Sequence, residues 1–91
     1  MAAIHIRRVH RLGRATARTR MEEIAHSIQH DLKTDYHWKG DTLHLKRPGA
    51  SATMHVSDGF VDLKVHLGLL LAPMKGPLEA AIQQRLDEVL G

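Results

Sequence analysis

Residues 36–67 decide the fold, and they read YHWKGDTLHLKRPGASATMHVSDGFVDLKVHL. Three short turns divide this stretch, at Gly40-Asp41, Pro48-Gly49 and Asp58-Gly59. Asp-Gly between alternating apolar residues is a strong hairpin signal. Gly40-Asp41 matches the other common kind of two-residue hairpin turn, in which Gly comes first. Between the turns, apolar and polar residues alternate with the two-residue period of half-buried strands. The stretch therefore predicts four consecutive antiparallel strands.

The registers that the three turns impose can be compared with one another. Two-residue loops align two apolar rows across the four strands: Trp38, Leu43, Met54, Leu63 and Tyr36, Leu45, Ala52, Val65. A slip of one residue in any hairpin would turn a set of these side chains toward water, so the common alignment supports the predicted order. The opposite face then carries two polar rows: His37, His44, Thr53, Lys64 and Lys39, Thr42, His55, Asp62.

The segment upstream of these hairpins begins with a strand, predicted over residues 3–9. Ile4 and Ile6 alternate with polar neighbours, as in a half-buried strand. Val9 breaks the alternation, so a bulge or a strand end is expected near Arg8. We expect this first strand to pair with the last one, which gives a five-stranded antiparallel sheet.

A helix is predicted over residues 14–32. Its apolar residues recur at helical spacing and form one stripe: Ala17, Met21, Ile24, Ala25, Ile28 and Leu32. Arg14 and Arg18 stand in the first turns, where the helix dipole favours acidic side chains. The sequence offers no structural reason for these two arginines.

The longest apolar run, residues 67–74, carries the chain from the sheet edge onto the sheet face. We expect a short helical turn over residues 69–75. The Gly76-Pro77 pair should kink or interrupt it, because a residue before proline avoids the α region, and Pro77 should open the last helix. The apolar stripe of that helix comprises Leu78, Ala81, Ile82, Leu86, Val89 and Leu90.

The predicted architecture is a single α+β domain over residues 1–91 with the element order β-α-β-β-β-β-α. An amphipathic helix must bury its apolar stripe against another element. The predicted sheet has one apolar face and the chain has two such helices. We therefore expect an antiparallel sheet with both helices on one face.

Composition narrows the classes of function. The 91 residues include no cysteine, which excludes disulfides, thiolate zinc sites and cysteine nucleophiles. No Gly-x-Ser-x-Gly motif occurs, and Asp62 opposite His55 is interpreted as a cross-strand ion pair rather than an acid–base pair. We predict no enzymatic activity and no cofactor. The first residues lack the layout of a signal peptide, and no apolar run approaches the ~20 residues that span a bilayer, so we expect a cytoplasmic protein.

The eight histidines of the chain raise the question of a metal site. His26 and His30 are four residues apart on one helix, while His37 and His44 face each other across the first predicted hairpin. A protein metal site needs at least a third ligand, so both pairs are weak candidates. We predict no metal site.

Four segments carry a family resemblance: Ile4-His5-Ile6-Arg7-Arg8, Tyr36-His37-Trp38-Lys39-Gly40-Asp41-Thr42-Leu43, Leu67-Gly68-Leu69-Leu70-Leu71 and Lys75-Gly76-Pro77-Leu78-Glu79. Together they resemble the polyhydroxyalkanoic acid system family of small bacterial proteins, whose genes lie beside polyester granule genes. The resemblance covers nearly the full length and implies an association with polyhydroxyalkanoate storage, without any catalytic residue. The element order is also similar to a shortened helix-grip (START-like) domain, in which a C-terminal helix lies across a curved antiparallel sheet.

We predict a non-enzymatic, granule-associated accessory protein that binds the surface of a polyhydroxyalkanoate granule or a granule-associated protein. The residues proposed for an apolar docking surface or pocket are Leu69, Leu70, Leu71, Met74 and Pro77. An alternative function is the binding of a small apolar ligand in a pocket of the helix-grip kind.

A third alternative is a nucleic-acid-binding regulator, because the first 20 residues hold six arginines and no acidic residue, in a chain with a net charge of +3. The candidate basic patch comprises Arg7, Arg8, Arg11, Arg14 and Arg18. Tyr36 and Trp38 fall in the predicted core and leave no stacking platform, so nucleic acid is not the expected partner. An exposed edge, at the Ile4 strand or the Tyr36 strand, offers an interface for a homodimer.

Overall fold

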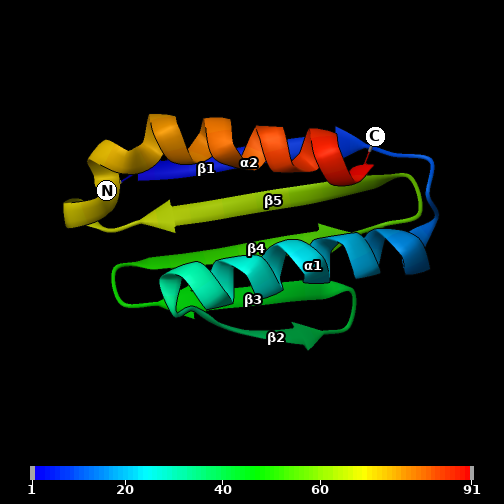
Figure 1. Cartoon of the computed structure of the whole chain (residues 1–91), viewed down its shortest axis with the longest axis horizontal. Helices are drawn as coiled ribbons and strands as arrows, with labels where there is room; N and C mark the ends of the chain where they lie inside the picture. Colours follow the sequence, from blue (N-terminus) through cyan, green and yellow to red (C-terminus); the bar gives the residue numbers. More distant parts are fainter. Residues whose placement is uncertain (1, 91) are drawn as a thin grey trace.

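The computed structural model describes residues 2–90, and the side chains of all of these except residues 31 and 32. The elements are β1 (Ala2–Val9), α1 (Arg14–Leu32), β2 (Asp35–Lys39), β3 (Thr42–Arg47), β4 (Ala50–Val56), β5 (Phe60–Leu67), the 3₁₀ helix η1 (Leu69–Met74) and α2 (Lys75–Leu90). The strands form one five-stranded antiparallel sheet in the order β1-β5-β4-β3-β2 (Figure 1). The predicted element order and the pairing of the first strand with the last are confirmed.

The predicted hairpin registers are confirmed across all three turns. Trp38 pairs with Leu43, Leu43 with Met54, and Met54 with Leu63. The second predicted row is also present as Tyr36, Leu45, Ala52 and Val65. Because the side-chain period of a strand is two residues, this register turns the apolar residues of the meander to one face, apart from Phe60 beside the last turn.

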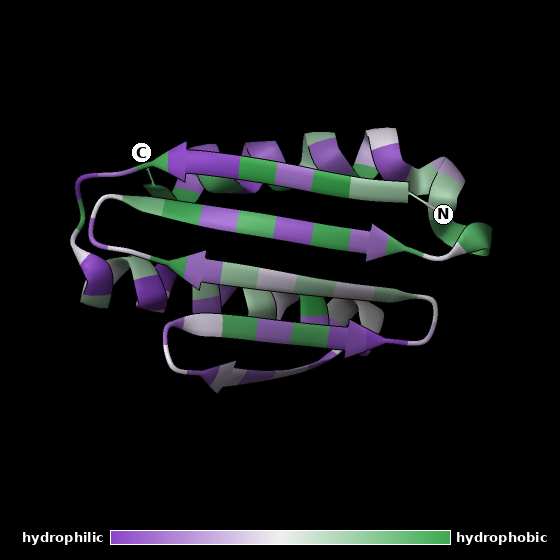
Figure 2. Cartoon of the chain, turned by 180° about the vertical axis from the view of Figure 1, so that it is seen from behind, coloured by the Kyte–Doolittle hydropathy of each residue, from purple (hydrophilic) through white to green (hydrophobic). Residues whose placement is uncertain are grey.

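Both helices lie on that apolar face, which confirms the predicted α+β arrangement (Figure 1). Seen from behind, the sheet lies in front of the helices and its strands show hydrophilic and hydrophobic residues in alternation (Figure 2). The fully buried large side chains come from the sheet and from both helices: Ile4, Met21, Leu43, Leu63, Leu86, Val56 and Val61. The core therefore lies between the sheet and the two helices.

Helix α1 has the predicted bounds and the predicted buried stripe. Ala17, Met21, Ile24 and Ala25 are buried and Ile28 is half-buried. The last member of the stripe, at position 32, lies outside the residues whose side chains the structure describes. The helix ends at Lys33, which adopts the left-handed conformation with φ 53° and donates its backbone N–H to the carbonyl of Gln29.

Helix α2 begins two residues earlier than predicted, at Lys75, so the predicted interruption at Gly76-Pro77 is wrong. Gly76 has no Cβ to meet the proline ring, and Pro77 lies in the first turn, where a backbone N–H has no partner within the helix. The break lies instead where η1 passes into α2. Ile82 and Leu86 are buried as predicted, but Ala81 is exposed, which corrects its place in the stripe.

Strand β1 runs without a bulge to its end at Val9, so of the two alternatives the strand end is confirmed. Arg8 takes the position that faces the helices, and Val9 points away from them with 75 % of its surface exposed. The guanidinium of Arg8 donates to Asp87 and Gln83 of α2. A polar residue at an inward position thus fixes the last helix to the edge strand.

Candidate functional site

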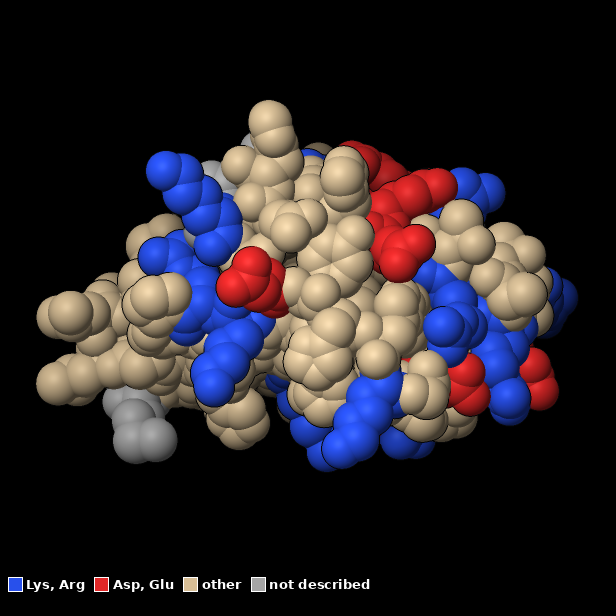
Figure 3. Space-filling view, turned by 90° about the horizontal axis from the view of Figure 1, so that it is seen from below, with Lys and Arg blue, Asp and Glu red and all other residues tan. Residues whose placement is uncertain are grey.

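An apolar tip stands at the junction of the sheet with α2. We use this name for Leu69, Leu70 and Met74 of η1, whose surfaces are 79 %, 93 % and 52 % exposed. The end of the molecule at which Figure 1 places η1 carries projecting uncharged side chains in the space-filling view (Figure 3). Monomeric proteins rarely expose large contiguous apolar surface without a use for it, so the tip is a candidate docking surface.

The tip is held in place by the turn between β3 and β4. Gly68 donates its backbone N–H to the carbonyl of Gly49 over 2.7 Å, and Leu71 donates to the carbonyl of Gly68 over 3.1 Å. Leu71 is half-buried, packs against the core and lies over Gly49. Of the five residues predicted for this surface, Leu71 therefore anchors η1, whereas the three tip residues and Pro77 are exposed.

The predicted basic patch is largely paired with acidic residues. Arg8 contacts Asp87 of α2, and Arg7 lies over the Phe60 ring at 4.5 Å from its centroid. Arg11 is exposed. The arginines of α1 reach the turns between the strands.

The structure explains why Arg14 and Arg18 stand in the first turns of α1, which the sequence alone did not. Asp41, in the turn between β2 and β3, lies 3.4 Å from Arg14 and 2.9 Å from Arg18. Arg18 also donates to the carbonyl of Gly40 over 2.7 Å and stacks over the Trp38 ring at 4.0 Å. Figure 3 shows acidic and basic side chains interspersed at this end of the molecule. These contacts fasten the start of α1 to the first hairpin.

The histidines do not gather into a site. His37 and His44 stack with ring centroids 5.2 Å apart, and His26 and His30 are exposed on α1. Among residues whose side chains the structure describes, no three metal-ligating side chains come together. The absence of a bound metal stays a prediction.

Asp62 pairs with a different histidine from the one considered in the sequence. The register places Asp62 opposite His55, but its carboxylate lies 2.6 Å from the Nε2 of His5 on the neighbouring strand. The Nδ1 of His55 lies 3.0 Å from the hydroxyl of Thr42 instead. Because the sequence predicted β1 beside β5, His5 on the polar side of β1 could have been considered as a partner of Asp62. The interpretation of Asp62 as one member of a cross-strand pair therefore holds, but the other member is His5 and not His55.

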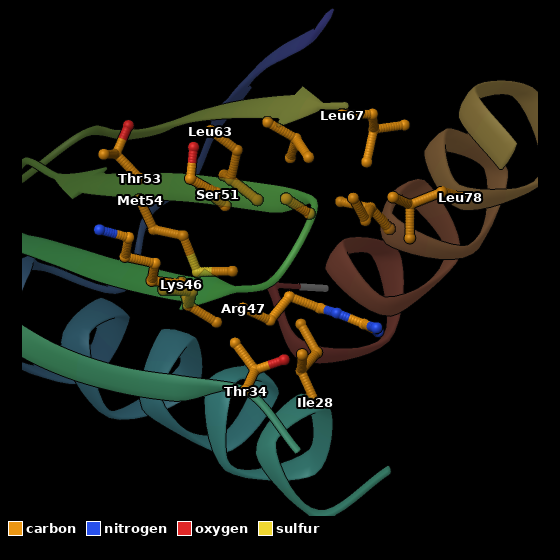
Figure 4. Close-up of a pocket in the computed structure, with 15 residues that line it drawn as sticks. Ile28, Thr34, Lys46, Arg47, Ser51, Thr53, Met54, Leu63, Leu67 and Leu78 are labelled. Atoms are coloured by element: carbon orange, nitrogen blue, oxygen red, sulfur yellow. The ribbon is translucent and has the colours of Figure 1, made fainter. Parts of the chain in front are cut away.

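A small apolar pocket lies between the two helices and the sheet (Figure 4). A pocket of this kind was one of the alternatives predicted from the sequence, but with other lining residues. Its volume is about 100 Å³. The residues that line it include Ile28, Leu45, Ala52, Met54, Leu67 and Leu78. None of the five residues predicted for an apolar pocket is among them. The pocket forms where β4 presents Ala50 and Ala52 beneath the helices, because alanine fills less space than the leucines and valines of the adjacent strands.

Two polar atoms at this pocket lack hydrogen-bond partners among the described residues: Oγ1 of Thr34 and Nε of Arg47. Thr34 is only 4 % exposed. The inward position of Arg47 could have been predicted from its spacing, because it continues the inward series of Leu43 and Leu45 on β3. A buried polar group without a partner is uncommon and points either to a functional site or to a cost in stability.

The Thr34 hydroxyl gives a direct test of that cost. We expect Thr34→Val to raise the free energy of unfolding by about 1 kcal/mol, because it replaces an unsatisfied buried hydroxyl with a methyl group of similar size. Urea unfolding of both proteins measures the change. Thr16→Val on the exposed start of α1 serves as the matched control and should change stability by less than about 0.5 kcal/mol. A loss of stability in Thr34→Val would show that the hydroxyl has a partner.

No helix among residues 2–90 is both long enough and apolar enough to cross a membrane.

Comparison with known proteins found no match among curated proteins and none among solved structures. One family model does match, and it covers residues 4–90. Its description is "Putative polyhydroxyalkanoic acid system protein". This match spans nearly the whole sheet and both helices, and the chain belongs to that family.

Proposed function

We propose that the protein is a non-enzymatic accessory protein of polyhydroxyalkanoate storage that binds the surface of the polyester granule through its apolar tip. The family membership supplies the context. The observation that carries the proposal is the exposure of Leu69, Leu70 and Met74 at one end of the molecule. A polyester surface is apolar and extended, so a projecting group of apolar side chains suits it better than a concave site would.

The anchoring of η1 supports the same function. Leu71 and the Gly68–Gly49 hydrogen bond hold the 3₁₀ helix while its other apolar side chains point outward. The tip is therefore ordered before it docks, and binding does not have to offset the entropy of folding a loose segment. Each leucine that leaves water on docking contributes roughly 1.5–3 kcal/mol.

The basic N-terminal region supports the proposal less than the tip does. Four of its five candidate arginines lie within 4 Å of carboxylates of the same chain: Arg7, Arg8, Arg14 and Arg18. Their charge is thus partly compensated, which weakens attraction to nucleic acid. The shortened helix-grip arrangement remains part of the proposal on the element order alone, since α2 runs along the strands β1 and β5 at one edge of the sheet (Figure 1).

Co-sedimentation with isolated granules tests the proposal. Leu70→Asp should weaken granule binding by about tenfold or more, because it removes one apolar contact and sets a charge against the polyester. The fold should survive, since 93 % of the Leu70 surface is exposed. Val9→Asp is the matched control: Val9 is 75 % exposed and lies at the far end of β1 from η1 (Figure 1). It should bind granules as the unchanged protein does.

Granules stripped of their own proteins separate the two kinds of partner. Binding to stripped granules, lost in Leu70→Asp and kept in Val9→Asp, supports direct contact with the polyester. Binding to intact granules alone would show that the partner is a granule-associated protein. If the unchanged protein stays in the supernatant with both preparations, the proposed function is wrong.

A further inference from the structure

The two edge strands of the sheet, β1 and β2, differ in the charges that they carry. Strand β1 holds Arg7 and Arg8 and no acidic residue, so a second copy of β1 would offer these arginines no acidic partner. Strand β2 begins with Asp35 and ends with Lys39. In an antiparallel pair the start of one strand lies beside the end of the other, so β2 is complementary in charge to a second copy of itself.

The backbone of β2 is open on the side away from β3. The two-residue turn closes on the pair Lys39–Thr42, whose backbone groups face each other. Hydrogen-bonded and non-hydrogen-bonded pairs alternate along an antiparallel ladder, so the backbone N–H and C=O groups of Tyr36 and Trp38 point away from β3. Strand β2 has neither a proline nor a bulge, two features that keep an edge from pairing. Figure 1 shows β2 beyond α1, at the open edge of the sheet.

We propose that the protein forms a symmetric homodimer in which β2 pairs with β2 of a second copy in the antiparallel direction. His37 is the middle residue of the strand, so a register centred on it pairs all five residues of β2. Asp35 then lies opposite the partner's Lys39, and Tyr36 lies opposite the partner's Trp38. The outward backbone groups of Tyr36 and Trp38 meet in this register and exchange hydrogen bonds, so the two sheets become one continuous sheet.

The aromatic residues of β2 support pairing with a second copy. Tyr36 and Trp38 belong to the apolar rows of the sheet, but both are only half-buried. Each would gain an aromatic ring of the partner on the side that β3 leaves open, and aromatic residues directly opposite each other form favourable cross-strand pairs. The Trp38 ring is already held, because Arg18 stacks over it and its Nε1 donates to Glu22 over 2.9 Å. Association therefore orders little that is mobile in the single chain.

Shifted registers fit less well than the one centred on His37. A slip of one residue would set the inward side chains of one copy beside the outward side chains of the other. A slip of two residues in either direction separates Asp35 from the partner's Lys39 and leaves fewer residues of β2 paired. Lys39 is the kind of charge that discourages pairing at an edge, and only the centred register sets it against a carboxylate of the partner's β2.

The short edge predicts a weak dimer. Stable interfaces bury roughly 1,200–2,000 Å², and a pairing limited to the five residues of β2 buries less. We therefore expect a dissociation constant on the order of tens of micromolar, measured by sedimentation equilibrium from about 1 µM to about 1 mM protein. The inference does not rest on the proposed granule docking, because no residue of the apolar tip lies on β2. Leu70→Asp should dimerise as the unchanged protein does.

Single cysteines test the edge and the register, because the chain contains none of its own. His37→Cys should form a disulfide-linked dimer under mild oxidation, since the register sets this position opposite its own copy with Cα atoms about 4.5 Å apart. His44→Cys is the matched control, one strand inward in the same row. Its copy would lie three strand spacings away, about 14 Å, so it should stay unlinked. His5→Cys marks the other edge strand and should also stay unlinked.

A charge exchange tests the pairing of Asp35 with Lys39. Asp35→Lys and Lys39→Asp each set like charges against each other at both ends of the paired strands, so each variant should dimerise about tenfold more weakly. An equal mixture of the two variants restores both attractive pairs and should dimerise as the unchanged protein does. Lys64→Asp makes the same charge change on the central strand β5 and should leave dimerisation unaltered. Asp35 and Lys39 are exposed, so these variants should keep the fold.

The proposal is overturned if the unchanged protein sediments as a monomer throughout the concentration range. It is also overturned if His37→Cys links no faster than His44→Cys, or if His5→Cys links instead, which would place the interface at β1. A mixture of Asp35→Lys with Lys39→Asp that dimerises no better than either variant alone would contradict the register centred on His37.

Discussion

Leu86→Ala is expected to lower the free energy of unfolding by about 3 kcal/mol, the largest stability effect among the changes considered. Leu86 is 0 % exposed and is the more completely buried of the two buried residues of α2. Its replacement removes apolar contacts and leaves a cavity that the surrounding sheet and helix fill only in part. For a chain of this size the loss is a large fraction of the total, since whole domains are stable by roughly 5–15 kcal/mol.

Urea unfolding at equilibrium measures the change, and Glu88→Ala supplies the control on the same helix. Glu88 is exposed, so its replacement should shift the free energy of unfolding by less than about 0.5 kcal/mol. The neighbouring residue Asp87 holds Arg8, so a loosened α2 should also release this contact with β1. Equal stabilities of the two variants would contradict the view that α2 closes the core.

The sheet could be predicted from the sequence because its turns and its alternation are independent signals that agree. Gly40-Asp41 and Asp58-Gly59 each fix a register, and a period of two residues tells which side chains share a face. The confirmed pairs Trp38–Leu43 and Met54–Leu63 follow from these signals alone. Helix α1 could be predicted equally well, because its buried stripe from Ala17 onward has a regular helical spacing.

The parts that escaped prediction depend on contacts between distant residues. Alternation alone assigns inward positions to Arg8 and Arg47, but charge argues for the surface, and only the packing of α2 shows that Arg8 has acceptors there. Arg14 and Arg18 looked misplaced because Asp41 is distant in sequence. The pocket depends on where the two helices lie over Ala52, which periodicity does not specify.

Gly49→Val is expected to lower the free energy of unfolding by about 2 kcal/mol and to move η1. Gly49 has φ +84° in the turn between β3 and β4, a conformation that is strained for any residue with a Cβ and most of all for a β-branched one. A Cβ at this position would lie 3.4 Å from Cδ1 of Leu71, so the further carbons of valine would press on the residue that anchors η1. Urea unfolding measures the first effect.

Gly40→Val separates backbone strain from the contact with Leu71. Gly40 has φ +61° in the preceding hairpin turn, and a Cβ there would meet nothing within 4 Å. It should lose a similar amount of stability through strain alone. If Leu71 orients the apolar tip, Gly49→Val should weaken granule binding while Gly40→Val, equally destabilised but still folded, should bind normally. Equal binding by both variants would show that η1 docks without its anchor, and that the order of the tip in the free protein does not contribute to affinity.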